Sequence, residues 1–165
     1  MRKRWSALAV VGCLALLLVS CLARDPKAVH LPEGIPSFVQ AQDFESIDWD
    51  RKATPFGDGN LVGNENRSGV IGADMPSLNG QKWMWHLWDA EPGDKLTVAG
   101  FEKASKTIHP LLIAADAWTL TLGGANNGAD AHVPSTVQIP HAGTWAIQLY
   151  VNDKPFDTLI YEIES

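Results

Sequence analysis

Cysteine is scarce in this chain of 165 residues, which has only Cys13 and Cys21. Cys13 lies within an apolar run near the start, so removal of that run leaves Cys21 alone. A single cysteine cannot form an internal disulfide, which excludes the class of small exported domains held together by disulfide bridges. We therefore expect the domain to be stabilised by its core, for which 45% hydrophobic residues are sufficient.

Basic charge is also scarce after the first four positions. Three of the 13 Lys and Arg residues precede Cys21, whereas all 19 acidic residues follow it, so the chain from Cys21 onward carries a formal net charge of −9. A surface this negative repels phosphate backbones. We expect no nucleic-acid partner.

Recognisable catalytic motifs are missing as well. The sequence has no G-x-S-x-G elbow, no S-x-x-K pair, no phosphate loop and no dinucleotide fingerprint. The nearby carboxylates Glu45, Asp48 and Asp50 are typical of a solvated face rather than an acid–base pair. We expect a protein that is not an enzyme and that needs no cofactor.

The first twenty residues have the pattern of an export signal. Basic residues at positions 2–4 precede an apolar run from Ala7 to Val19, which is shorter than the roughly 20 residues that a membrane-spanning helix needs. The run ends in Leu18-Val19-Ser20-Cys21, which resembles the bacterial lipobox. That resemblance implies cleavage before Cys21 and a diacylglycerol on its thiol, so that the residue carries two or three acyl chains such as palmitate. We expect a signal peptide over 1–20, a flexible tether over 21–37 and one domain over 38–165.

The pattern of the rest predicts strands. Fourteen Gly and ten Pro residues indicate many turns, and alternation is clearest from Thr144 to Val151 and from Phe156 to Ile163, on either side of a turn at Asn152-Asp153-Lys154. Residues 38–50 fit a short helix or an irregular strand, and Ala53 to Gly69 is expected to be mostly loop. The remaining strand candidates cover 68–73, 81–88, 94–101, 107–114 (with Pro110 indicating an edge), 118–122 and 133–139. Together they predict an all-β, immunoglobulin-like antiparallel β-sandwich of about seven or eight strands.

The densest aromatic stretch runs from Gln81 to Trp88. In a strand, Trp83 and Trp85 lie on one face, and Met84, His86 and Trp88 lie on the other. Trp83, Trp85 and Trp88 are candidates for a ligand platform for sugar rings or peptide. They also fit a tryptophan-rich core with the strand buried on both sides, which a domain without disulfides needs.

Histidines and oxygen-bearing loops raise the question of a metal. His86, His109, His132 and His141 lie in the predicted domain, and Met84 is spaced to share a site with His86, a combination that suits copper or zinc. None of the usual paired-histidine spacings occurs, so a core histidine and loop histidines explain the pattern equally simply. Asn- and Asp-rich loops at 58–60, 64–66 and 126–130 offer calcium ligands but are also ordinary turn composition.

Several segments resemble an uncharacterised lipoprotein family of Bacillus-type Gram-positive bacteria. They comprise Thr54-Pro-Phe56, Val70-Ile-Gly72, the block Lys82-Trp-Met-Trp-His-Leu-Trp88, and Pro140-His-Ala-Gly-Thr-Trp145. The family's block reads K-Y-M-W-H-F-W-G, so Trp83, Leu87 and Asp89 depart from it. The resemblance implies one sandwich domain behind a lipidated cysteine, and it implies no catalytic residue.

The sequence therefore predicts a lipoprotein anchored in the cell membrane through Cys21 and facing the extracytoplasmic side. Without a catalytic motif, we expect a binding or structural module of the envelope, with an envelope protein or ligand that the sequence does not identify. The alternative is a copper- or zinc-binding module that uses His86 with other histidines.

Overall fold

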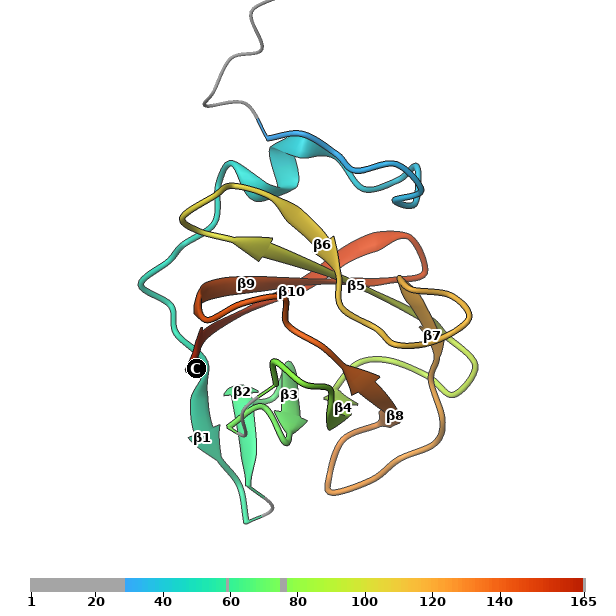
Figure 1. Cartoon of the computed structure of the whole chain (residues 1–165). Coiled ribbons are helices and arrows are strands. Elements are labelled where there is room, and N and C mark those ends of the chain that lie inside the picture. Colours follow the sequence, from blue (N-terminus) through green and yellow to red (C-terminus); the bar gives the residue numbers. More distant parts are fainter. Residues whose placement is uncertain (1–28, 59, 75–76, 165) are drawn as a thin grey trace, which may run out of the picture.

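The computed structural model describes residues 29–58, 60–74 and 77–164. Two antiparallel sheets lie face to face, and a segment from the start of the described chain lies on the outer side of one of them (Figure 1). The predicted signal peptide, Cys21 and the tether up to residue 28 lie outside the described residues. The fold is an antiparallel β-sandwich, as predicted.

The first sheet has the strand order β1-β2-β3-β4-β8. Its strand β4 lies between β3 and β8, which makes it central, and β8 carries Pro134 at the edge, where a missing backbone donor costs least. The strands are β1 (Thr54–Phe56), β2 (Leu61–Asn64), β3 (Ser68–Ile71), β4 (Gln81–Leu87) and β8 (Ala131–Val137).

The second sheet has the order β10-β9-β5-β6, and β7 also pairs with β5. The β9–β10 hairpin turns at Asn152 and Asp153, which both have positive φ as a tight hairpin turn of this kind requires. The strands are β5 (Lys95–Glu102), β6 (Ile108–Pro110), β7 (Thr119–Thr121), β9 (Gly143–Val151) and β10 (Lys154–Ile163).

The strand count corrects one prediction. Ten strands occur among the described residues, against the seven or eight predicted, because β1 and β2 lie in the stretch that was expected to be mostly loop. The glycines there hide the strand pattern but are needed for close packing. A Cβ on Gly69 of β3 would come within 2.7 Å of the Phe56 ring, so the ring lies directly over a bare backbone.

The main core lies between the sheets. Trp83, Trp85 and Leu87 of β4 point inward and are buried, and Trp83 packs edge-on against Tyr161 of β10 at 5.5 Å between ring centroids. Trp145, Ile147 and Leu149 of β9 close the core from the other sheet. Burial of this much apolar surface provides the stability that disulfides provide in small disulfide-linked domains.

A second apolar cluster lies on the outer face of the second sheet. The chain before β1, including the short 3-10 helix η1 (Ala41–Phe44), covers that face. Phe44 packs on Phe101 at 5.2 Å, and the Tyr150 hydroxyl donates to Asp43 Oδ2 at 2.9 Å. The segment 38–50, left open between helix and strand, is thus a helical turn within irregular chain.

Part of the predicted tether also lies on this face. Val29 is buried in the second cluster, and His30 forms a parallel bridge with Thr107. The boundary between tether and domain at residue 37 stays a prediction. Within the predicted tether, Val29 and His30 contact the second sheet and its loops. The helix η1 has four residues, and no helix in the described ranges has the length and apolar character needed to cross a membrane.

Candidate functional site

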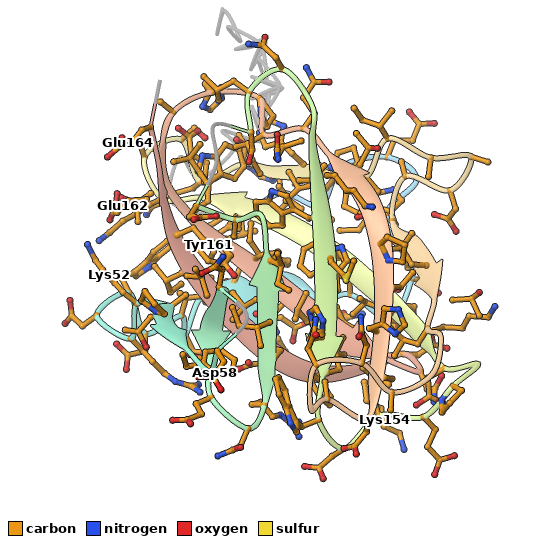
Figure 2. The ribbon with its side chains drawn as sticks, turned by 90° about the horizontal axis from the view of Figure 1, so that it is seen from below. Lys52, Asp58, Lys154, Tyr161, Glu162 and Glu164 are labelled. Atoms are coloured by element: carbon orange, nitrogen blue, oxygen red, sulfur yellow. The ribbon has the colours of Figure 1, made fainter. Side chains whose placement is uncertain are left out.

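The outer face of the first sheet carries four of the residues singled out in the sequence, Met84, His86, Trp88 and His132. Figure 2 is seen from below relative to Figure 1, so this sheet is nearest the viewer. On β4 the alternation that points Trp83 and Trp85 inward points Met84 and His86 outward. We call this surface the open face.

The three candidate platform tryptophans separate into two groups. Trp83 and Trp85 are buried in the core, and their indole N–H groups donate to Ser77 Oγ at 3.1 Å and Ser135 Oγ at 2.8 Å. Trp88 is half-buried on the open face, just after β4 ends. Of the predicted platform, the structure therefore leaves only Trp88 within reach of a ligand.

Trp88 forms one wall of a pocket. Its ring lies 5.7 Å from the Phe56 ring at an interplanar angle of 54°. The pocket has a volume of about 460 Å³ and is lined by Phe56, Gly57, Asp58, Leu61, Glu65, Asn66, Trp88, Asn127 and Gly128. We call it the Phe56–Trp88 pocket. Aromatic rings and side-chain oxygens converge here on one space.

Three turns meet at this pocket. Asp58 lies between β1 and β2, Asn66 between β2 and β3, and Asn127 in the loop before β8, and the two asparagines have φ values of 59° and 49°. The Trp88 amide donates to the Arg67 carbonyl, which ties the aromatic wall to the β2–β3 turn. The loops noted in the sequence as sources of calcium ligands, including the one with Glu65, thus converge, whereas Phe56 was not singled out as a site residue. Only the pairing of β1 with β2 brings Phe56 here.

The histidines form two pairs. His86 and His132 lie directly opposite each other on β4 and β8, with ring centroids 6.2 Å apart. His86 is buried and bonds through Nδ1 to the Met84 carbonyl oxygen at 3.0 Å. His132 bonds through Nδ1 to the Gly124 carbonyl oxygen at 2.6 Å. The structure therefore brings together Met84, His86 and His132 of the predicted metal set.

The second pair lies at an edge of the sandwich, over Trp145. His109 and His141 have ring centroids 6.0 Å apart, and each packs against the Trp145 ring. His141 Nδ1 lies 3.1 Å from Glu102 Oε1, a carboxylate that also accepts from Ser105 Oγ. These histidines are separate from the first pair, so the four predicted ligands do not converge on one site.

Burial affects the protonation of one histidine in each pair. Desolvation lowers the pKa of His86, and the neighbouring His132 lowers it further. Desolvation likewise lowers the pKa of His109, with His141 adding to the effect and Glu102 opposing it. Near neutral pH, both imidazoles are therefore held neutral, the form that binds metals and hydrogen-bond donors.

Across the described ranges, no three His, Cys, Asp or Glu side chains are arranged to hold a metal ion. This applies to His109, His141 and Glu102, although they lie close together. A three-ligand metal site in the described ranges therefore has to include another kind of ligand, such as the Met84 thioether.

Comparison with known proteins agrees with the fold. The chain is similar to a crystal structure of a protein from Bacillus anthracis described as a candidate lipoprotein, with a TM-score of 0.61 and 25% identity over 78% of this chain and 96% of that one. No curated protein matches the sequence. The profile of a family described as a domain of unknown function, DUF4871, matches residues 38–161. The resemblance to an uncharacterised lipoprotein family of Bacillus-type bacteria is thereby confirmed, and the chain belongs to the DUF4871 family.

Proposed function

We propose that this protein is a lipid-anchored lipoprotein of the cell envelope that acts as a non-catalytic binding module through its Phe56–Trp88 pocket. The anchor is supported by the lipobox-like residues that end in Cys21 and by the similarity to a candidate lipoprotein. The binding role is assigned to the pocket because half-buried aromatic rings and polar loop side chains face one space there.

The charge of the pocket favours a cationic ligand. Asp58 and Glu65 line it, and no Lys or Arg is among its lining residues. The nearest basic residue in the sequence, Arg67, is engaged elsewhere: its guanidinium donates to the Phe156 carbonyl at 2.9 Å and lies over the Phe156 ring. The carboxylates therefore have no internal counter-ion in the pocket.

The aromatic wall favours an organic cation over a metal ion. Calcium requires six to eight oxygen ligands, whereas much of this wall consists of the Phe56 and Trp88 rings. An alkylammonium group gains from an aromatic face, by roughly 0.5–2 kcal/mol, and also from nearby carboxylates. The ligand class that fits is a small molecule or side chain bearing an ammonium group.

Saturation-transfer NMR on the full chain in a maltoside detergent tests the pocket. The probes are choline, its uncharged isostere 3,3-dimethylbutan-1-ol, and calcium as a competitor. We expect transfer to choline, much weaker transfer to the neutral isostere, and loss of the choline signal in Trp88→Leu and in the double variant Asp58→Asn/Glu65→Gln.

The matched control is Trp49→Leu, which removes a half-buried tryptophan on the covered side of the molecule. It is expected to leave the choline signal unchanged. Equal transfer to both probes, or an equal loss in Trp49→Leu and Trp88→Leu, would refute the cationic pocket. Complete displacement of choline by calcium would reassign it as a calcium site.

The anchor is tested separately by cell fractionation of Cys21→Ala. Without the thiol there is no acceptor for the lipid, so we expect the mature protein to leave the membrane fraction or to remain unprocessed. Labelling with a palmitate analogue that is as strong in Cys21→Ala as in the wild type would contradict the assignment of Cys21 as the lipid acceptor.

A further inference from the structure

We propose that Met84, His86 and His132 form a binding site for monovalent copper on the open face. The site is independent of the ammonium pocket, although the Asn126–Asn127 turn borders both. It rests on the placement of three potential ligands, on the hydrogen bonds that orient them, and on the softness of the set.

Strand pairing places the three side chains together. His86 and His132 occupy opposite positions in the β4–β8 ladder, and Met84 precedes His86 by two residues, on the same face of β4. The ring centroids are 6.2 Å apart. With metal–nitrogen bonds of about 2.0 Å, two imidazoles on one ion have centroids about 5–6 Å apart, which is close to the spacing of this pair.

One turn of the chain reaches both kinds of ligand. The Asn127 side-chain amide nitrogen lies 3.0 Å from His86 Nε2, and the Asn126 side-chain nitrogen lies 3.5 Å from Met84 Sδ. The Met84 thioether and His86 Nε2 therefore lie next to the side chains of two consecutive residues, Asn126 and Asn127. Asn127 is exposed, so its amide can move aside when an ion takes its place.

The hydrogen bonds at Nδ1 leave Nε2 unprotonated on both rings. A carbonyl oxygen only accepts, so the bonds of His86 Nδ1 to the Met84 carbonyl and of His132 Nδ1 to the Gly124 carbonyl place the proton on Nδ1 in both neutral rings. Each Nε2 then carries a lone pair. Histidines that bind metals are commonly held in this way, with the second nitrogen donating to a backbone carbonyl.

The composition of the set favours Cu(I). Zinc in proteins is bound by Cys, His, Asp and Glu, and no third residue of these kinds joins the two histidines in the described ranges. A thioether is a soft ligand that selects Cu(I), and three neutral ligands suit a monovalent ion. Binding displaces the Asn127 amide and involves no electron transfer.

The test measures Cu(I) retention against the chelator bicinchoninate under anaerobic conditions. It uses the full chain in maltoside detergent with Cys13→Ala and Cys21→Ala, so that no thiol competes for the ion. We expect one Cu(I) per chain, and at least a tenfold weaker affinity in Met84→Leu, which conserves side-chain volume, and in His132→Asn. X-ray absorption is expected to show a copper–sulfur distance that disappears in Met84→Leu.

The matched control is His109→Asn, which alters the other histidine pair and is expected to leave Cu(I) affinity unchanged. Failure to retain Cu(I), equal affinity in wild type and Met84→Leu, or a loss in His109→Asn equal to that in His132→Asn would overturn the proposal. Zn(II) binding as tight as that of Cu(I), and unaffected by Met84→Leu, would also overturn it. Circular dichroism of each variant establishes that it is folded.

Discussion

The outer faces of the two sheets differ in what covers them. On the second sheet, Phe101 and Tyr150 project outward and are buried beneath the chain that precedes β1. On the first sheet, Met84, Trp88 and His132 project outward and remain half-exposed. The outer face of the second sheet is thus part of a second apolar core, whereas the outer face of the first sheet is partly accessible to solvent.

This difference separates stability from recognition within one small domain. A covered sheet face gains from every apolar side chain that it buries, whereas a face that binds must leave such side chains unburied. The Met84 thioether and the His132 imidazole of the open face stay half-exposed, whereas Phe101, Tyr150 and Ile160 of the covered face are buried. Both the pocket and the proposed copper site lie on the open face.

The largest expected difference between the faces comes from a pair of phenylalanines. Phe44→Ala removes a buried ring from the covered face and should lower the free energy of unfolding by about 3–5 kcal/mol. Phe56→Ala removes a half-buried ring from the open face and should cost no more than about 1.5 kcal/mol. Urea unfolding followed by tryptophan fluorescence measures both. Equal costs would mean that the covering segment adds no second core.

A smaller effect is expected from the hydroxyl that holds the covering segment to β9. Burial raises the pKa of Tyr150 well above its ordinary value, and the nearby Asp43 raises it further, so the hydroxyl stays protonated and donates to that carboxylate. Tyr150→Phe should cost about 1–2 kcal/mol.

Hydrogen exchange of residues 29–50 locates the effect of Tyr150→Phe. Exchange in this segment should become faster in Tyr150→Phe. In Tyr161→Phe it should not, because that hydroxyl donates to the Val62 carbonyl and so links the two sheets instead. Unchanged exchange in Tyr150→Phe would show that apolar contacts alone hold the segment.

The smallest expected effect is a dependence of stability on pH at the His109–His141 pair. Desolvation lowers the pKa of His109 in the folded state, so the unfolded chain binds more protons as the pH falls below about 6.5. The contribution of His109 to the free energy of unfolding is therefore fully present above that pH and is lost towards pH 5. His109→Gln should flatten this part of the profile, measured by urea unfolding at each pH, whereas the exposed His30→Gln should not. If the free energy of unfolding of the wild type rises towards pH 5, the expected direction of the pH dependence is wrong.

Much of the sandwich follows from local sequence. The alternation from Thr144 to Val151 and the turn at Asn152 and Asp153 predicted the β9–β10 hairpin, and Pro110 predicted the edge position of β6. These features depend on neighbouring residues, and periodicity reports them directly. β1 and β2 were missed because glycine interrupts the alternation: Gly63 of β2 lies so close to the Ser68 carbonyl of β3 that a Cβ would not fit, and such backbone packing has no signature in the alternation pattern.

The candidate site was less predictable, because it depends on contacts between distant parts of the chain. Spacing alone shows Met84 beside His86, but the partner His132 comes from the β4–β8 register, across 46 positions. The same holds for Phe56 and Trp88, which meet only through the pairing of β1, β2, β3 and β4. A register is set by the whole sheet, so no local pattern identifies these neighbours.

The covering segment also bears on how the molecule stands above a bilayer. A lipid on Cys21 lies eight residues before Val29, a stretch of at most about 28 Å, and Val29 is buried on the outer side of the second sheet. In Figure 1 the described chain begins at the top, and the first sheet lies at the bottom. With the proposed anchor on Cys21, the covered side lies nearer the membrane, and the pocket and the two opposed imidazoles lie on the side of the domain away from it.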